Sequence, residues 1–190
     1  MYDIRILTDM DAAYEFYHTY SAATPDEIRD QSELLPGGMP PALRLMPVSQ
    51  GTIDYWFAGE TRMTLGAFFG DKLVGIASGS VSSERKVGYL SYICVAHDHR
   101  RLGLATDLCD RLEETLAARP EVEKLEAVFY NPVQLPWYIP HGSGDYHPCL
   151  PGVDKSSGLY LFLKNRNWRD FATQNCYYRR MADYADKPNI

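Results

Sequence analysis

The sequence is poor in cysteine, and its cysteines are spaced unlike those of a metal or redox site. No two of the four are separated by only two residues. Zinc binding and thioredoxin-like chemistry usually depend on such pairs, so neither is expected, and nothing in the spacing suggests a disulfide framework. We therefore expect no bound metal. The cysteines are Cys94, Cys109, Cys149 and Cys176.

An excess of basic residues and long apolar runs are also missing. The formal net charge is −6, which argues against a broad surface for nucleic acid or for an anionic membrane. No apolar run approaches the length of a bilayer span, and residues 1–11 lack the basic stretch and apolar core of a signal peptide. These absences predict a cytoplasmic protein without nucleic-acid or membrane partners. The negative charge suits a cationic partner, although it also serves solubility alone.

Length and composition allow one substantial hydrophobic core. The chain has 190 residues, of which 45% are hydrophobic, enough for one domain or two small ones. No internal repeat or low-complexity tract divides it. We expect a single domain over residues 1–181, followed by a polar tail at residues 182–190.

Patterning before residue 62 predicts one strand and two helices. Residues 2–7 alternate apolar and polar, as a strand does. A helix is expected at residues 10–22, with aromatic side chains packed on a sheet. A proline followed by two acidic residues starts a second helix at residues 25–35. Residues 42–60 fit no single pattern.

The centre of the chain predicts an antiparallel meander followed by a crossover. Strands are expected at residues 63–69, 73–80 and 87–95, joined by two short polar turns. The period then becomes that of a helix lying on a sheet, with Leu104, Leu108, Leu112 and Leu116. Residues 124–130 form the next strand, so strand, helix and strand make a βαβ unit with one parallel pair.

The C-terminal part is irregular until a short helix. Residues 131–157 are rich in Pro, Gly, Tyr and His and show no periodicity. A helix is expected at residues 159–166. Residues 168–171 and 176–181 are predicted to form a terminal hairpin.

The segment from His97 to Thr106 joins the last meander strand to the leucine-striped helix. The amino end of a helix has unpaired N–H groups and a positive partial charge, which together bind phosphate. Gly103 lets the backbone approach an anion, and Ala105 leaves the surface open. Arg100 and Arg101 oppose the helix dipole, at about 0.3–1 kcal/mol each when exposed, unless an anion binds there. The alternative is a solvated loop whose arginines pair with carboxylates. Charge alone does not decide between this loop and an anion site.

The pattern Arg100-x-x-Gly103-x-Ala105, after a strand that ends Tyr92-Ile93-Cys94-Val95, resembles the R/Q-x-x-G-x-G/A motif of the GNAT N-acetyltransferase superfamily. The order of the surrounding elements is similar too, over residues 2–181. No G-x-G-x-x-G follows an early strand, so a Rossmann fold is not favoured. The resemblance implies an α/β (α+β) fold: a mixed, mainly antiparallel sheet flanked by helices, with one parallel βαβ crossover and splayed central strands.

The same resemblance implies that coenzyme A binds at this loop. Backbone N–H groups at the start of the helix would hold the pyrophosphate, and the main chain at the end of the strand would pair with the pantetheine arm. Asn131 matches a position where family members often carry Asn, although it also fits a simple turn. The implied coenzyme A-binding residues are Ile93, Cys94, Val95, Arg100, Arg101, Leu102, Gly103, Leu104, Ala105, Thr106 and Asn131.

Family members usually transfer the acyl group directly to an amine, which requires a general base and a general acid. The family places a Tyr acid in a helix of the form F-Y-E-K-x-G-F, where this chain has Leu163. Tyr160, one helical turn earlier, is the candidate acid, unless it only packs. Asn167 replaces the helix-ending Gly and tolerates the same left-handed conformation. For the base, the strand at residues 87–95 offers Ser91, which would relay a proton through water.

The segment at residues 131–157 is longer than the family's usual connection. Long ordered loops are often functional, so we expect it to line the acceptor site, with His141 and His147 as candidates to face the acceptor. The alternative is a loop that only covers a sheet edge.

The resemblance implies transfer of an acetyl or other short acyl group from acetyl-CoA to a primary amine of a small molecule or peptide. The missing Tyr and the missing strand base favour a second hypothesis, a degenerate module that binds coenzyme A as a sensor. A homodimer, and a fragment of a tandem two-domain protein, are further alternatives that the sequence leaves open.

Overall fold

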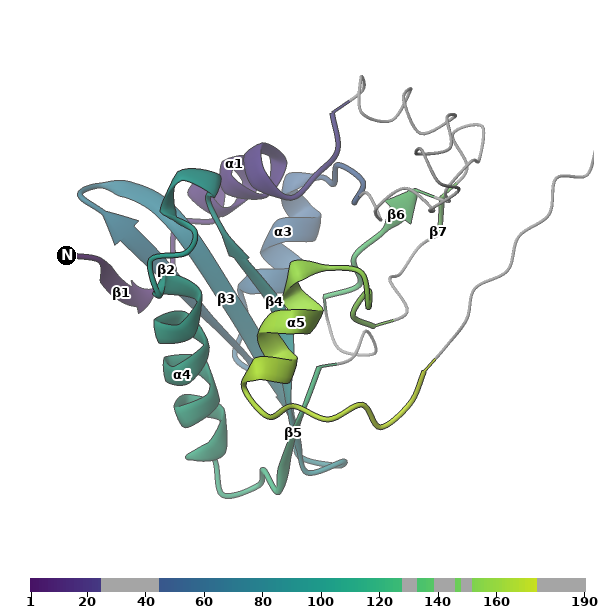
Figure 1. Cartoon of the computed structure of the whole chain (residues 1–190). Coiled ribbons are helices and arrows are strands. Elements are labelled where there is room, and N and C mark those ends of the chain that lie inside the picture. Colours follow the sequence, from purple (N-terminus) through teal and green to yellow (C-terminus); the bar gives the residue numbers. More distant parts are fainter. Residues whose placement is uncertain (25–44, 128–132, 139–145, 148–151, 174–190) are drawn as a thin grey trace, which may run out of the picture.

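The computed structural model describes residues 1–24, 45–127, 133–138, 146–147 and 152–173, and at residues 146–147 it describes only the backbone. Its main feature is a five-stranded sheet with the order β1-β2-β3-β4-β5 (Figure 1). Neighbouring strands are antiparallel except for β4 and β5, which are parallel. The strands are β1 (Asp3–Ile6), β2 (Arg62–Phe69), β3 (Lys72–Ser82), β4 (Val87–Val95) and β5 (Lys124–Glu126). This mainly antiparallel sheet with one parallel crossover confirms the predicted fold class.

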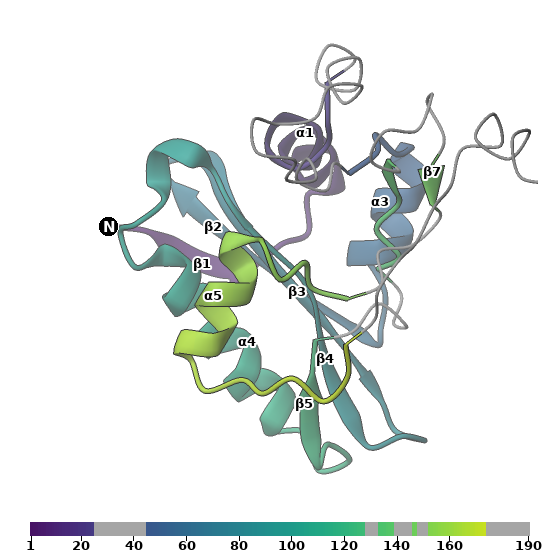
Figure 2. The same ribbon diagram turned by 45° about the vertical axis from the view of Figure 1, so that its right-hand side comes forward.

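Helices cover both faces of the sheet. One face carries α1 (Met10–Tyr20) and α3 (Gln50–Phe57), and the other carries α4 (Leu104–Ala117) and α5 (Gly158–Asn165) (Figure 2). The leucines predicted to form a stripe are all buried on α4, as expected for a helix lying on a sheet.

Glycines in the strands allow α4 to lie close to the sheet and identify the face that it covers. A Cβ atom on Gly75 would approach Leu108 Cδ1 to 2.9 Å, and one on Gly79 would approach Leu116 Cδ1 to the same distance. A Cβ atom on Gly88 would lie 3.3 Å from Leu116 Cβ, which is also on α4. These positions therefore face α4, and because side chains alternate along a strand, their neighbours face α1 and α3.

The N-terminal expectations are met where the structure describes them. The first helix ends at Tyr20, and Asp9 caps it by accepting a hydrogen bond from Ala12 N at 3.0 Å. Residues 42–60, which fitted no single pattern in the sequence, contain α3, and Ser49 caps the amino end of this helix. The helix predicted at residues 25–35 lies outside the described residues.

One prediction near the C-terminus is wrong: residues 168–171 do not form a strand. Asn167 has φ 65°, the left-handed conformation expected of it, and reverses the chain after α5. Trp168 then turns back and donates its indole N–H to Glu113 on α4, at 3.3 Å. The partner strand at residues 176–181 and the tail at residues 182–190 lie outside the described residues.

Two short strands follow β5. The strands β6 (Trp137–Tyr138) and β7 (Tyr146–His147) pair antiparallel. Trp137 also bridges to Leu45, which in turn bridges to Ala22 after α1. Part of the segment at residues 131–157 therefore lies on the α1 side of the sheet.

Within the described ranges, no helix combines the length and the apolar character needed to cross a membrane.

Candidate functional site

The loop before α4 has an unusual backbone. The strand β4 ends at Val95, a 3₁₀ helix spans His97–His99, and α4 begins at Leu104. Gly103 occupies the N-cap position with φ 85° and supplies no side-chain cap. Arg101 also has a positive φ, 62°, which is uncommon for a residue with a side chain and tends to occur at functional sites.

This backbone leaves a row of amides without partners. Among the described residues, the N–H groups of residues 101–105 donate no hydrogen bond, whereas Thr106 N and Asp107 N both bind Gly103 O. A Cβ atom on Gly103 would meet nothing within 4 Å, so the space in front of the helix is open. Unpaired amides at the positive end of a 14-residue helix fit an anionic group such as a pyrophosphate.

The two arginines of the loop do not pair with carboxylates in the described part of the chain. Arg100 donates from Nε to the carbonyl of Val95 at 2.7 Å, which fastens the loop to the end of β4. Arg101 is exposed. The arginine–carboxylate pairs of the alternative reading are therefore not present among the described residues.

The sequence did not predict the contacts that hold this loop against the rest of the protein. The hydroxyl of Tyr2 lies 3.0 Å from His99 Nδ1, and Phe69 packs on the same ring with centroids 5.5 Å apart. His97 packs edge-on against Tyr20, with centroids 6.0 Å apart. Both histidines of the loop thus anchor it to aromatic side chains that lie far away in the sequence.

The end of β4 has one strand edge that no described strand covers. Ile93, Cys94 and Val95 pair with β3 on one side. On the other side, the described pairing with β5 ends at Tyr89 and Glu126. Arg100 already binds the carbonyl of Val95, so that acceptor is not free to pair with a ligand along this edge.

Ser91 lies at an irregularity in β4. Ser78 pairs with Tyr92 and Gly79 with Leu90, so Ser91 is an extra residue, a β-bulge. Its hydroxyl oxygen is buried and has no hydrogen-bond partner. The next residue, Tyr92, is fully enclosed: its hydroxyl binds Ser21 Oγ, and burial raises the pKa of Tyr92 well above its ordinary value.

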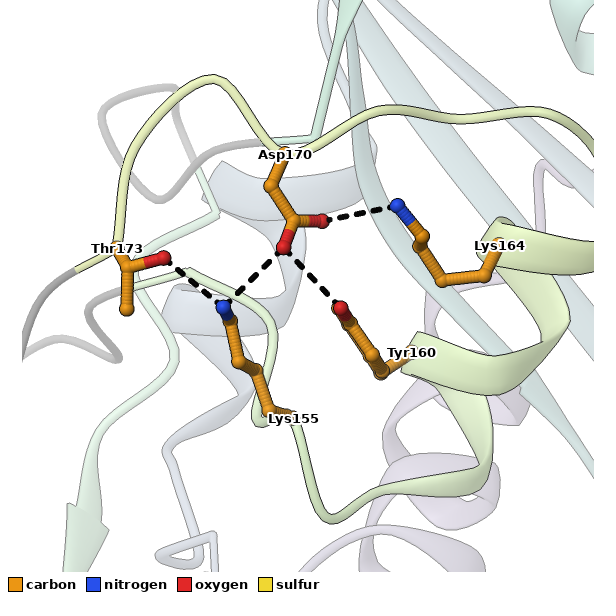
Figure 3. A network of polar contacts seen from close by, with 5 residues as sticks. All are labelled: Lys155, Tyr160, Lys164, Asp170 and Thr173. Carbon is orange, nitrogen blue, oxygen red and sulfur yellow. Dashed lines mark hydrogen bonds and ion pairs between the residues drawn. The ribbon is translucent and has the colours of Figure 1, made fainter.

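Tyr160 belongs to a polar network on the surface of α5 (Figure 3). Its hydroxyl donates to Asp170 Oδ2 at 3.1 Å, and Lys155 and Lys164 reach the same carboxylate at 3.1 Å and 3.4 Å. The hydrogen bond from Lys155 is the main cause that lowers the pKa of Asp170. Leu163 is buried. No hydrogen bond joins Tyr160 to Ser91 in the part of the chain that the structure describes.

Other predicted site residues are not described. Asn131 and His141 lie outside the described residues, and for His147 only the backbone in β7 is described.

Comparisons with known proteins agree with this architecture. The model of the family described as "Acetyltransferase (GNAT) family" matches residues 14–138, whereas no curated protein gives a significant match. An acetyltransferase of Trypanosoma brucei has a similar structure: 16% identity, TM-score 0.54, and coverage of 94% of this chain and 100% of that chain.

Two aminoglycoside acetyltransferases have similar structures as well. One, from an uncultured soil metagenomic sample, was solved with sisomicin; it is 11% identical, with a TM-score of 0.54 over 94% of this chain and 97% of that chain. The other, AAC(6')-Iy, was solved with a bisubstrate analogue of coenzyme A and a monomethyl-acetylneamine; it is 11% identical, with a TM-score of 0.52 over 95% and 98%. At such identities these likenesses describe the fold alone.

Proposed function

Because this chain belongs to the GNAT acetyltransferase family, we propose that it transfers an acetyl group from acetyl-CoA to a primary amine. The acceptor is a small molecule or a peptide, and the net charge of −6 favours a cationic one. Residues 1–181 act as one domain in this proposal.

The observation that carries the proposal is the row of unpaired amides at residues 101–105, in front of α4. These amides and Thr106 would hold the pyrophosphate of the acetyl donor. The main chain of Ile93 and Cys94 would hold its pantetheine arm. Asn131, which lies outside the described residues, would also bind the donor. When bound, the donor supplies an activated acetyl thioester.

The chain's own groups have defined tasks in such a transfer. A backbone N–H near Val95 would polarise the acetyl carbonyl. Ser91, with its unpartnered hydroxyl, would pass a proton to water. Tyr160 would protonate the departing sulfur, and to do so it must give up its hydrogen bond to Asp170.

The first test concerns coenzyme A binding, measured by isothermal titration calorimetry. Gly103→Glu places a negative charge and a strained left-handed side chain at the anion site, so affinity should fall at least about 100-fold, or 2.7 kcal/mol. Gly152→Glu is the matched control, because Gly152 also has a positive φ and open space around its Cβ direction. Affinity that survives Gly103→Glu would disprove this placement of the pyrophosphate.

A second candidate function is coenzyme A binding without catalysis. The observation that favours it is Leu163, which is buried at the position where the family carries its Tyr acid. Release of free thiol from acetyl-CoA separates the two functions. Measured with sisomicin, spermidine and an alanyl peptide as acceptors, release with any amine supports the transferase, whereas coenzyme A binding with no release supports the sensor.

A further inference from the structure

An exposed aromatic ring lies at the end of the sheet from which the loop to α4 begins. Phe69 is the last residue of β2, and 54% of its surface is exposed. The hairpin between β2 and β3 lies at the same end of the sheet as the end of β4, because Gly75 pairs with Val95. An aromatic side chain that stays open at this place is available to stack with a flat ligand group.

Two neighbouring side chains hold the ring of Phe69. Its centroid lies 5.9 Å from that of Tyr2 and 5.5 Å from that of His99. The hydroxyl of Tyr2 also lies 3.0 Å from His99 Nδ1, so the three side chains form one cluster, here called the Phe69 platform. Figure 2 shows the N-terminal end of the chain beside the loop that leads into α4, in agreement with this contact. Because the platform is already assembled, little side-chain entropy is lost when a ligand stacks on it.

The Phe69 platform lies close to the row of unpaired amides. His99 belongs to the platform, and Arg101, where the row begins, follows it by two residues, a span of at most about 7 Å. Leu102 stands within the row and is 63% exposed. The anion site is therefore next to two exposed apolar side chains, those of Phe69 and Leu102. A ligand that matches both features joins an anionic group to a flat ring, and this is the chemistry of a nucleotide.

A positive charge lies beside the exposed ring. Lys72 is the partner of Phe69 across the hairpin, and residues that pair directly across two strands point to the same face. Lys72 is exposed. Among the described residues its ammonium group makes no ion pair, not even with the adjacent Asp71. An unpaired lysine next to an aromatic ring and a row of amides fits a second phosphate group.

We propose that this surface binds the nucleotide end of coenzyme A: the adenine stacks on Phe69, and Lys72 pairs with the 3′-phosphate. The inference rests on the proposed function, because it takes the acetyl donor to be a coenzyme A thioester. It adds contacts to the part of the donor that lies beyond the pyrophosphate and the pantetheine arm. The protein then recognises the whole coenzyme rather than the arm alone.

These contacts are remote from the reacting thioester. They hold the donor equally well before and during the transfer, so they lower the dissociation constant and KM for the donor and leave kcat unchanged. Acetyl thioesters of shorter pantetheine compounds should therefore be poor donors through a high KM.

Isothermal titration calorimetry with three probes tests the stacking contact. The probes are coenzyme A, dephospho-coenzyme A, which lacks the 3′-phosphate, and 4′-phosphopantetheine, which lacks the nucleotide end. Phe69→Ala should weaken binding of the first two about 5–150-fold, the usual effect of losing one base–aromatic stack. Binding of 4′-phosphopantetheine should stay within twofold, because this probe has no adenine. Phe171→Ala is the matched control, since Phe171 is 71% exposed and lies beyond α5, and it should change none of the three affinities.

Lys72→Met tests the phosphate contact separately. Its affinity for coenzyme A should fall about 3–10-fold, as expected for an exposed charge-assisted contact, and the loss should shrink as salt is added. Its affinity for dephospho-coenzyme A should not change. Lys86→Met is the matched control, because Lys86 is also exposed and lies in the turn between β3 and β4, at the other end of the sheet.

A third variant separates stacking from support of the loop. If loss of the Phe69 ring instead displaces His99 and the loop, 4′-phosphopantetheine binds more weakly by the same factor as coenzyme A, and this outcome overturns the stacking role. Phe69→Trp keeps an aromatic face, so it should keep the affinity for coenzyme A within twofold. Its added fluorescence, measured against the wild-type background, should be quenched by coenzyme A and dephospho-coenzyme A and not by 4′-phosphopantetheine.

The outcomes keep this inference apart from the proposed function. Wild-type protein that releases thiol from acetyl-CoA, yet binds 4′-phosphopantetheine as tightly as coenzyme A, overturns the nucleotide site and leaves the transferase standing. Protein that shows the expected affinities but releases no thiol with any amine overturns the transferase and keeps the nucleotide site. An unchanged affinity of Phe69→Ala or Lys72→Met for coenzyme A overturns the role of that residue.

Discussion

At the scale of single residues, the loop before α4 is held by side chains from distant parts of the chain, Tyr2, Tyr20 and Phe69. The loop from Arg100 to Ala105 was recognised because its residues follow one another; its amides donate no hydrogen bond among the described residues, and its binding of coenzyme A stays a prediction. The pairing of Tyr89 with Glu126 was not predicted, because strand register cannot be read from one strand. The contact of Tyr2 with His99 was missed for the same reason.

The thiol of Cys109 gives a prediction at this scale. Burial, together with a hydrogen bond to Glu113, raises the pKa of Cys109 to about 12. Only the thiolate reacts with iodoacetamide. At pH 8, alkylation of folded protein at Cys109 should therefore be roughly 10³-fold slower than in urea, and it should speed up as the pH rises toward 12. Peptide mass spectrometry over time measures both rates. Equal rates in buffer and urea would contradict the burial of this thiol.

At the scale of elements, the spacing of hydrophobic residues predicted which helices and strands contribute to the core. A strand prediction failed where the chain reverses its direction. The leucine stripe and the three meander strands follow from period alone, and both are found. The strand predicted at residues 168–171 failed because Asn167 reverses the chain and Trp168 binds Glu113 on α4. An alternating pattern in the sequence does not reveal such a partner.

Two leucine substitutions test the stripe. Leu112 is fully buried between α4 and the sheet, so Leu112→Ala should lower the free energy of unfolding by about 2–5 kcal/mol. Leu161 on α5 is exposed, so the chemically identical Leu161→Ala should stay within about 0.5 kcal/mol of wild type. Urea unfolding followed by circular dichroism measures both. Similar losses for the two variants would show that α4 is not packed as described.

At the scale of the whole molecule, a partly buried cluster of charged side chains attaches α5 to α4. Arg166 after α5 reaches Asp110 at 2.5 Å and Glu113 at 3.1 Å, both on α4. Burial by itself lowers the pKa of Arg166, but the two carboxylates raise it overall, so the arginine stays charged. The helix with Tyr160 is thereby fixed to α4.

Arg166→Met should loosen α5 selectively. Loss of this partly buried cluster should cost between about 1 and 3 kcal/mol, and hydrogen exchange of α5 amides should accelerate while that of β2 and β3 stays unchanged. Lys164→Met is the control, because Lys164 pairs with Asp170 at the surface. Uniform acceleration across the sheet would instead mean that Arg166 supports the whole fold.

The single parallel pair has a consequence for the order of assembly during synthesis. The strands β2, β3 and β4 follow one another through short turns, so they can pair as soon as they leave the ribosome. Glu126 reaches Tyr89 only after all of α4 has been made and has crossed the sheet, and such non-local parallel contacts form slowly. In a nascent chain the loop before α4 is therefore complete before β5 can pair with β4, so this edge of the sheet is the last part of it to form.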